Sequence, residues 1–118
     1  MTQARLTITQ DTAPEGVRVL ALAGEIDHTT ADTFRHALTA HDGPAPNTVI
    51  DLRHVTFMDS SGINVLIAAH QAAHAQGGRL YLTRVPAPVH TVLHIVGLDD
   101  LIPIYPTLDQ ALTAQDAA

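Results

Sequence analysis

Apolar positions along the chain follow strand-like and helix-like spacings in turn, beginning with two strands. Over Arg5–Gln10, Leu6 and Ile8 alternate with polar residues, whereas Val17–Ala23 is almost continuously apolar. Alternation predicts a strand with one exposed face, and the continuous run predicts a more central strand. Turn residues fill Asp11–Gly16 between them, so the two strands are expected to pair as a hairpin.

The first helix is predicted after a short loop. Gly24 ends the second strand in this interpretation, and Glu25–Asp27 form the loop. Thr29 and Asp32 have the spacing of a capping box at a helix N-terminus. One helical face is then formed by Ala31, Phe34, Leu38 and His41, before a loop at Asp42-Gly43-Pro44.

The stretch Val49–Leu66 joins a buried strand to an apolar helix. Aliphatic and β-branched residues dominate Val49–Leu52, which is typical of a strand covered on both faces. Arg53 and His54 are expected to turn the chain after this strand. The helix should follow the polar corner Asp59-Ser60-Ser61-Gly62.

Two N-cap residues are open for this helix. If Asp59 is the cap, Met58 and Ile63 take the positions of a hydrophobic staple. If Ser60 is the cap, its hydroxyl lies at the positive end of the helix, where a phosphate would be stabilised. The helix is apolar on more than one side up to Gln76, which predicts that it is well buried.

The last third of the chain predicts two further strands and two further helices. They are a strand at Arg79–Thr83, a helix from Pro86 or Pro88 to a stop at Gly97, an edge strand at Ile102–Tyr105 and a helix from Thr107 to Leu112. Strands alternating with helices predict one α/β domain over residues 1–118. Its core covers about 5–113, and residues 114–118 are expected to fray.

Composition excludes several classes of protein. Apolar residues make up 46% of the chain, which excludes a wholly disordered protein, and no run has the length of a membrane span or a signal peptide. The absence of cysteine excludes disulfides, thiolate catalysis and cysteine-based metal sites. A formal net charge of -6 disfavours direct nucleic-acid binding and favours a basic protein partner. We therefore expect a cytoplasmic protein without membrane insertion.

The polar corner is the strongest candidate for chemistry. A purely structural capping role competes there with a modified or reactive Ser60. A hydrolase is disfavoured, since Met58 stands where the Gly-x-Ser-x-Gly elbow has its first glycine, and phosphorylation of Ser60 fits better. Asp27 and Asp59 could form a carboxylate pair for acid–base or magnesium chemistry, although aspartates are common at caps and loop ends. We predict no catalytic residue.

Eight histidines in the chain raise the question of a metal site. His70/His74 and His90/His94 each have the one-turn spacing of metal ligands on a helix. Neither pair is accompanied by the glutamate of the zincin pattern, and the sequence shows no third ligand. We therefore predict neither a metal site nor a cofactor.

Three segments of the chain carry a family resemblance. They are GEIDHTTA at Gly24–Ala31, FMDSSGINVL at Phe57–Leu66 and VGLDDLIPIY at Val96–Tyr105. The second closely resembles the phosphoacceptor segment of the anti-sigma factor antagonists, which are small stand-alone proteins of the STAS domain family. The first resembles the element that these proteins place beside the acceptor serine. The likeness runs from about Leu6 to Leu112 and implies a single STAS-type domain, with a mixed β-sheet of about four to five strands surrounded by about four helices.

The resemblance also implies a function. The unmodified protein would bind an anti-sigma factor that is also a serine kinase, and so release a sigma factor. Phosphorylation of Ser60 would end this binding, and a serine phosphatase would restore it. The residues implied in partner recognition are Gly24, Glu25, Asp27, Asp59, Ser61, Gly62 and Asn64. Asn64 stands where the family most often has glycine, which is expected to narrow the range of partner kinases.

Two other interpretations remain open. In the first, the chain is a stand-alone STAS scaffold subunit of a transport or stress-signalling complex. In the second, it is a small metal-dependent hydrolase. Phosphorylation by a kinase homologue would favour the antagonist over the scaffold, and activity that survives chelation would disfavour the hydrolase.

Overall fold

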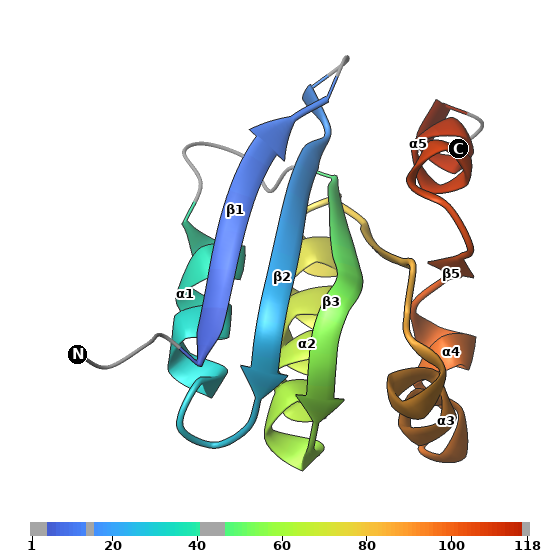
Figure 1. Ribbon diagram of the computed structural model, residues 1–118. Coiled ribbons are helices and arrows are strands. Elements are labelled where there is room, and N and C mark those ends of the chain that lie inside the picture. The colour runs from blue at the N-terminus through green and yellow to red at the C-terminus, as the bar shows by residue number, and fades with distance from the viewer. Residues whose placement is uncertain (1–4, 14–15, 41–46, 117–118) are drawn as a thin grey trace.

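Strands and helices alternate along the chain after an opening hairpin, as the apolar spacing predicted (Figure 1). The computed structural model describes residues 5–13, 16–40 and 47–116. Over these residues the elements are β1 (Leu6–Thr12), β2 (Arg18–Ile26), α1 (Ala31–Thr39), β3 (Thr48–Met58), α2 (Ser60–Ala75), β4 (Leu80–Thr83), α3 (Ala87–Ile95), α4 (Leu98–Leu101), β5 (Ile104–Tyr105) and α5 (Leu108–Asp116).

The described strands form one mixed sheet in the order β1-β2-β3-β4-β5, which confirms the expected α/β architecture. β1 pairs antiparallel with β2, and the other neighbours pair parallel. In this register Leu6 lies opposite Gly24, and Ile26 lies opposite Met58. The carboxyl ends of β2 and β3 therefore meet at one edge of the sheet, together with the beginning of β1.

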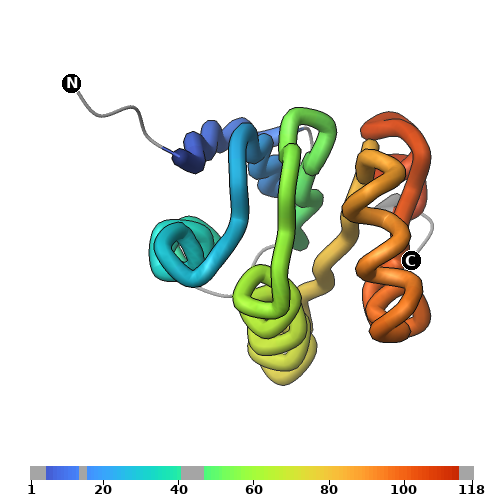
Figure 2. Tube along the Cα trace, turned by 60° about the horizontal axis from the view of Figure 1, so that its bottom comes forward, coloured from blue at the N-terminus to red at the C-terminus, as the bar shows by residue number. Residues whose placement is uncertain are grey.

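α1 and α2 cover one face of the sheet, and the main core between them and the strands also contains Val89 and Leu93 of α3. Figure 2 shows both helices on the same side of the strands. The largest fully buried side chains of this core are those of Phe34, Leu20, Leu22, Ile26, Ile50, Leu52, Leu66, Leu82, Leu93 and Ile102. The core is thus almost entirely aliphatic, as the scarcity of aromatic residues requires.

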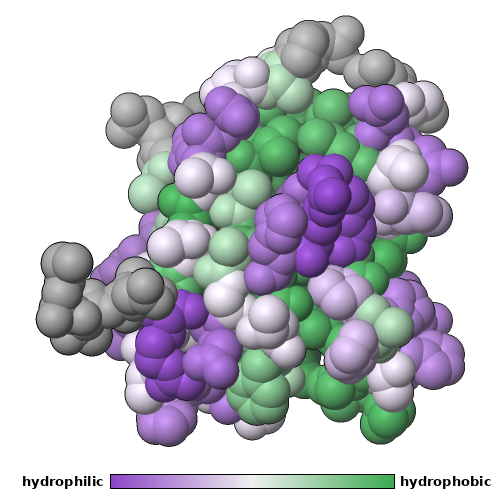
Figure 3. Space-filling view, viewed as in Figure 1, coloured by the Kyte–Doolittle hydropathy of each residue, from purple (hydrophilic) through white to green (hydrophobic). Residues whose placement is uncertain are grey.

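α5 covers the opposite face, but only over β3–β5. It packs there on a second, smaller core built around Val49, Tyr81 and Ala111. Over β1 and β2 this face is uncovered, and Figure 3 shows polar and apolar side chains mixed on it. Ala21 and Ala23 of β2 are accordingly only half-buried.

Arg18 joins α1 to the sheet from inside the protein. The residue is 5% exposed, and no described carboxylate pairs with it. Its guanidinium donates to the carbonyl oxygens of Ala37 and Leu38 at 3.1 and 2.7 Å, and to the Thr48 hydroxyl at 3.1 Å. Burial lowers the pKa of Arg18. The buried cation supplies partners for the last carbonyls of α1, which have none within the helix.

β3 is longer than predicted. Arg53 and His54, which were expected to turn the chain, lie inside this strand. Two shifts of register against β2 place extra residues in β3, and each shift changes the face to which the following side chains point. The buried positions therefore become Leu52, Val55 and Met58. Arg53 and His54 therefore lie at an irregularity within the strand and do not form a turn.

β2 also continues past Gly24, which was expected to end it. Glu25 and Ile26 are strand residues, so the predicted loop begins only at Asp27. Gly24 has a φ of +119° and lies at a register shift. A Cβ atom at this position would lie 2.0 Å from the carbonyl oxygen of Arg5. Only glycine fits so close to the neighbouring strand, and it bends β2 without ending it.

The start of α1 differs from the prediction. Thr30 is the N-cap of this helix and makes no side-chain capping bond, so the predicted capping box of Thr29 and Asp32 does not form. Asp32 instead pairs with Arg35 on the helix surface. His41 and the loop predicted after it lie outside the described residues.

The later helices also depart from their predicted limits. α2 is well buried only up to Leu66, because its second half extends past the core, and its remaining residues are half-buried or exposed. Gly77 and Gly97 follow the ends of α2 and α3 with positive φ, and the stop at Gly97 was predicted. The short helix α4 was not predicted, and α5 continues past Leu112 to Asp116. Fraying of residues 114–118 stays a prediction.

No helix within the described ranges combines the length and the apolar character that crossing a membrane requires.

Candidate functional site

Asp27 and Asp59 follow the paired ends of β2 and β3. Ile26 and Met58, the last residues of these strands, are register partners. The Asp59 N–H donates to the Ile26 carbonyl oxygen at 3.1 Å and ties the start of α2 to the end of β2. The two polar loops that the sequence places far apart therefore adjoin at one edge of the sheet.

Asp59, rather than Ser60, is the N-cap of α2. Its carboxylate accepts from the Ser61 N–H at 2.8 Å. Met58 and Ile63 are both buried, as expected for the staple positions of this register. Ser60 then takes the first helical position, where it is exposed and its hydroxyl bonds to no described residue. This hydroxyl is accessible to a group supplied by another molecule.

Gly62 brings the first turn of α2 close to the sheet. It is buried, and a Cβ atom there would lie 2.6 Å from Ile26 Cγ2 and 2.8 Å from Met58 Cγ. Real side chains do not approach so closely, so a larger residue would push the helix away from the strand ends. Gly62 therefore fixes the position of Ser60 and offers no side chain to a partner.

Asp27 organises the loop between β2 and α1. Its Oδ1 accepts from the Thr29 N–H at 2.8 Å and from the Thr29 hydroxyl at 2.6 Å, and its Oδ2 accepts from Arg5. The Thr30 hydroxyl accepts from the Asp27 N–H at 2.9 Å and donates to the Glu25 carbonyl oxygen at 2.9 Å. Asp27 is thus a buried carboxylate with every oxygen bonded, which suits a structural role better than acid–base chemistry.

Arg5 is a site residue that the sequence analysis did not single out. Its guanidinium donates to the Glu25 carboxylate at 2.8 Å and to the Thr29 hydroxyl at 2.8 Å, in addition to Asp27. The alternation of the first strand showed only that Arg5 points outward. The signal that identifies it is the register of the hairpin, which places Leu6 opposite Gly24.

We expect acid to weaken the contribution of Asp27 to stability. The hydrogen bond from the Thr29 hydroxyl is the main cause that lowers the pKa of Asp27, with the Thr29 N–H and the charge of Arg5 acting in the same direction. A carboxyl with a lowered pKa stabilises the fold fully above its unfolded-state pKa, about 3.9, and ceases to do so as pH falls through its folded-state value. The difference in unfolding free energy between the wild type and Asp27→Asn should therefore be constant from about pH 7 to about pH 5 and shrink below about pH 4.

Urea unfolding at a series of pH values measures this difference. Thr29→Val is the matched variant, because it removes the leading hydrogen bond and leaves the carboxyl in place. It should reduce the pH-dependent part of the difference without abolishing it. A gap between the wild type and Asp27→Asn that persists unchanged to about pH 2 would contradict this assignment.

The remaining implied recognition residues lie near the end of β2 and in the first turns of α2. Glu25 and Ser61 are half-buried, and Asn64 is exposed one helical turn further on. Phe57, which lies opposite Glu25 in the register, has 48% of its surface exposed and was not predicted as a site residue. An exposed aromatic side chain among polar groups is typical of protein interfaces.

The histidine pairs do not assemble a metal centre within the described part of the chain. No group of three or more metal-binding side chains occurs there. His70 and His74 stack on one another, with ring centroids 6.1 Å apart. His94 Nδ1 lies 2.7 Å from the Asp99 carboxylate, and this hydrogen bond raises the pKa of His94.

Comparison with known proteins finds related sequences and related structures for this chain. The family model of the STAS domain matches residues 9–111. The anti-sigma F factor antagonist of Paenibacillus polymyxa is 34% identical over 100 residues, which cover 83% of this chain and 86% of that protein. The anti-sigma-F factor antagonist RsfB of Mycobacterium tuberculosis is 33% identical over 100 residues, covering 83% of this chain and 80% of that protein.

Solved structures show the same likeness. An anti-sigma factor antagonist from Mycobacterium paratuberculosis superposes with a TM-score of 0.82 at 35% identity and covers 92% of both chains. The antagonist SpoIIAA in its unphosphorylated form gives a TM-score of 0.78 at 23% identity, over 95% of this chain and 98% of that chain. The murine anion transporter Slc26a9 gives 0.77 at 18% identity, over 99% of this chain and 23% of that chain. The last two likenesses concern the fold alone.

Proposed function

Since this chain belongs to the STAS domain family, we propose that it is an anti-sigma factor antagonist, a binding switch controlled by phosphorylation of Ser60. The unmodified protein binds an anti-sigma factor that is also a serine kinase, and so releases a sigma factor in the cytoplasm. Relatives that are 34% and 33% identical bear the name of anti-sigma factor antagonist. The observation that best supports a switch at this position is the exposed Ser60 hydroxyl without a partner among the described residues.

The proposed recognition surface surrounds Ser60 at the carboxyl edge of β2 and β3. Glu25, Asp59 and Asn64 supply polar groups, and Phe57 supplies an exposed apolar side chain. The net charge of -6 favours a basic surface on the anti-sigma factor and disfavours direct contact with nucleic acid. The other implied residues fix the shape of this surface: Gly24, Asp27, Ser61 and Gly62.

Phosphorylation would act on the interface and leave the fold intact. A phosphate brings about -1.5 to -2 charges. At a helix N-terminus the helix dipole stabilises such a charge by about 0.3–1 kcal/mol, while the Asp59 carboxylate already bonds the Ser61 N–H at this end of α2. The Asp59 carboxylate remains next to the phosphate, so a partner surface that closes on a neutral serine would meet two adjacent negative groups. A serine phosphatase would reset the switch.

We expect the phosphorylated protein to bind its anti-sigma factor about a hundredfold more weakly than the unmodified protein, which corresponds to about 2.7 kcal/mol. Its melting temperature and circular dichroism should stay unchanged. Ser60→Ala should keep full affinity and resist modification, and Ser60→Asp should reproduce part of the loss. Titration calorimetry with the purified anti-sigma factor measures these affinities.

The modified residue is identified by incubation with ATP and the kinase, followed by intact mass and peptide mapping. Ser61→Ala is the matched control, because it removes the neighbouring hydroxyl and keeps the capping N–H. This variant should still be phosphorylated and released. Phosphate on Ser61, on Thr29 or on Thr30, or undiminished affinity of the phosphorylated protein, would contradict the proposal.

A scaffold role in a transport complex is less well supported. The likeness to the anion transporter is at 18% identity and covers 23% of that chain, so it speaks for the fold only. Relatives at about twice this identity are antagonists, which are regulatory proteins, and we therefore propose a binding protein and not an enzyme.

A further inference from the structure

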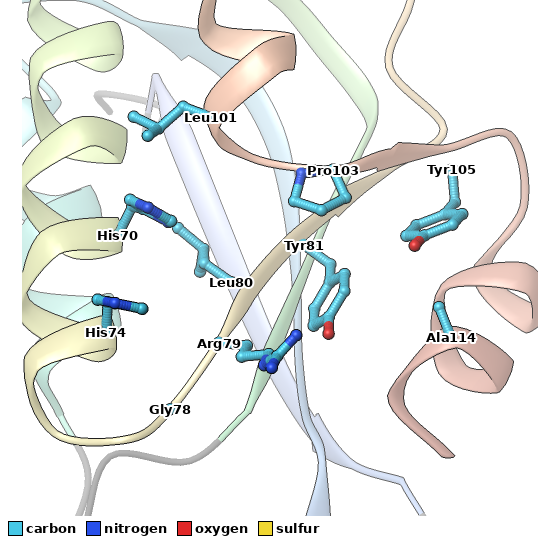
Figure 4. Close-up of a pocket in the computed structure, with 10 residues that line it drawn as sticks. All are labelled: His70, His74, Gly78, Arg79, Leu80, Tyr81, Leu101, Pro103, Tyr105 and Ala114. Carbon is cyan, nitrogen blue, oxygen red and sulfur yellow. The ribbon is translucent and has the colours of Figure 1, made fainter. Parts of the chain in front are cut away.

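A cleft of about 490 Å³ lies away from Ser60, beside the second half of α2 (Figure 4). It opens between that helix, the amino end of β4, and the segment from α4 to α5. His70, which lines it, follows Ser60 by ten residues of α2, or about 15 Å along the helix axis. The volume is within the range of small-molecule sites, about 300–1,000 Å³. The cleft is therefore separate from the proposed recognition surface.

One wall of the cleft is rich in hydrogen-bond donors. His70 and His74 project from α2 with their rings stacked, whereas Arg79, which precedes β4, lies on the other side of Leu80, beside Tyr81 (Figure 4). No described residue pairs with the Arg79 guanidinium; its backbone is bonded, through the N–H to the Asn47 side chain at 3.0 Å and through the carbonyl oxygen to the Thr48 N–H at 2.9 Å. None of the described lining residues is acidic, on a chain with a net charge of -6. Arg79 is therefore the one charged side chain among the described lining residues.

The other wall is aromatic. The rings of Tyr81 and Tyr105 lie with centroids 6.0 Å apart at an angle of 37°, and Pro103 lies beside them (Figure 4). Tyr81 is 4% exposed because its ring packs in the second core, so Tyr105 and Pro103 supply most of the accessible surface of this wall. Tyrosine faces pack well against flat ring systems.

We propose that the cleft binds a small organic anion composed of a flat aromatic ring system and one carboxylate. The carboxylate accepts from Arg79, whose forked guanidinium matches its two oxygens, and from the ring N–H groups of His70 or His74. The ring packs against Tyr105 and Pro103. An adjoining hollow that shares Tyr105 contains Asp109, which repels the anion and keeps the carboxylate on the side of Arg79.

The position of the cleft in the fold favours a ligand with a single negative charge. Sites for polyphosphates use helix N-termini or glycine-rich loops, where several backbone N–H groups converge. Here His70 and His74 lie on the C-terminal half of α2, where the helix dipole is negative. One guanidinium balances the single charge of a carboxylate and does not balance the charges of a chain of phosphates.

The test uses naphthoate and its neutral amide, naphthamide, as probes of the same ring system. Naphthoate added to isotope-labelled protein should shift the amide resonances of Arg79, Leu80, Tyr81 and Tyr105 in a saturable way, and leave those of Ser60–Asn64 unchanged. Naphthamide should bind about tenfold more weakly. A nucleoside triphosphate should not compete with naphthoate. Equal affinity of the two probes, shifts centred elsewhere or competition by the triphosphate would each overturn the proposal.

Matched variants separate the contribution of the ligand's carboxylate to binding from the contribution of its ring. Arg79→Gln should weaken naphthoate about tenfold and leave naphthamide unchanged, and the double variant His70→Gln with His74→Gln should show the same pattern. These side chains are exposed or half-buried, so the variants should fold. Arg53→Gln and His36→Gln alter exposed residues outside the cleft and should change neither affinity. Unchanged naphthoate binding by Arg79→Gln, or loss of binding in the two controls, would show that no specific anion site exists here.

Discussion

Replacing Arg18 by methionine is expected to lower the free energy of unfolding by about 3–5 kcal/mol, although methionine fills a similar volume. The guanidinium donates to the carbonyl oxygens of Ala37, Leu38 and Ala40 at the end of α1, and also to the Thr48 hydroxyl, inside the protein. A buried acceptor that loses its donor costs about 1–3 kcal/mol, and the carbonyls of Ala37 and Leu38 would both lose theirs. Urea or thermal unfolding of the two proteins measures the difference.

Arg35→Met is the control for this prediction. Arg35 is also an arginine of the α1 region, but it is exposed and, among the described residues, its side chain pairs with Asp32 alone, on the surface. Such pairs contribute about 0–1 kcal/mol, so this variant should lie close to the wild type. Equal stabilities of the Arg18 and Arg35 variants would mean that the buried cation does not hold α1 on the sheet.

Replacing Gly24 by alanine should destabilise the protein by about 4 kcal/mol. Two costs add at this position. The φ of +119° is strained for any residue with a Cβ atom, by about 1–3 kcal/mol. The new methyl group would also lie 2.0 Å from the Arg5 carbonyl oxygen, which is backbone of the paired strand and cannot rotate away. Relief of this overlap requires β1 to move, at a further cost of about 1–3 kcal/mol.

The comparison with Gly16→Ala separates these two costs. Gly16 also has a positive φ, of +79°, but nothing lies within 4 Å of a Cβ atom built there. The conformational cost alone is about 1–2 kcal/mol, so this variant should be clearly more stable than Gly24→Ala. The Gly24 variant should in addition lose protection of the β1 amides from hydrogen exchange. Similar stabilities of the two variants would refute the close contact with Arg5.

Strands and helices could be predicted from the sequence wherever the apolar spacing within one element was sufficient. Features that depend on how two strands align with each other could not be predicted. Arg53 and His54 read as a turn because the period of two breaks there, whereas the break arises from register shifts against β2. Gly24 read as a strand end for the same reason, since a glycine that permits close approach of a neighbouring strand looks identical in sequence to one that stops a strand.

Part of the candidate site could also be predicted from the sequence. Asp59 and Ser60 were identified from local capping chemistry, but the choice between them needed the backbone geometry of the helix start. Arg5 was missed because its partners follow it by about twenty residues or more and only the hairpin register brings them together. The cleft near Arg79 was missed because its two walls come from segments that no motif connects.

The strand order of the sheet also bears on how the protein is made. Because β1 to β5 lie in the sheet in the order in which they occur in the chain, each strand pairs only with the strand synthesised before it and the one synthesised after it. No strand has to wait for a strand beyond its neighbours in the chain before it pairs. The sheet can therefore grow by one strand at a time as the chain leaves the ribosome. Until β4 is complete, the edge of β3 is open on the growing chain, and this is the stage at which a nascent chain would need protection from aggregation.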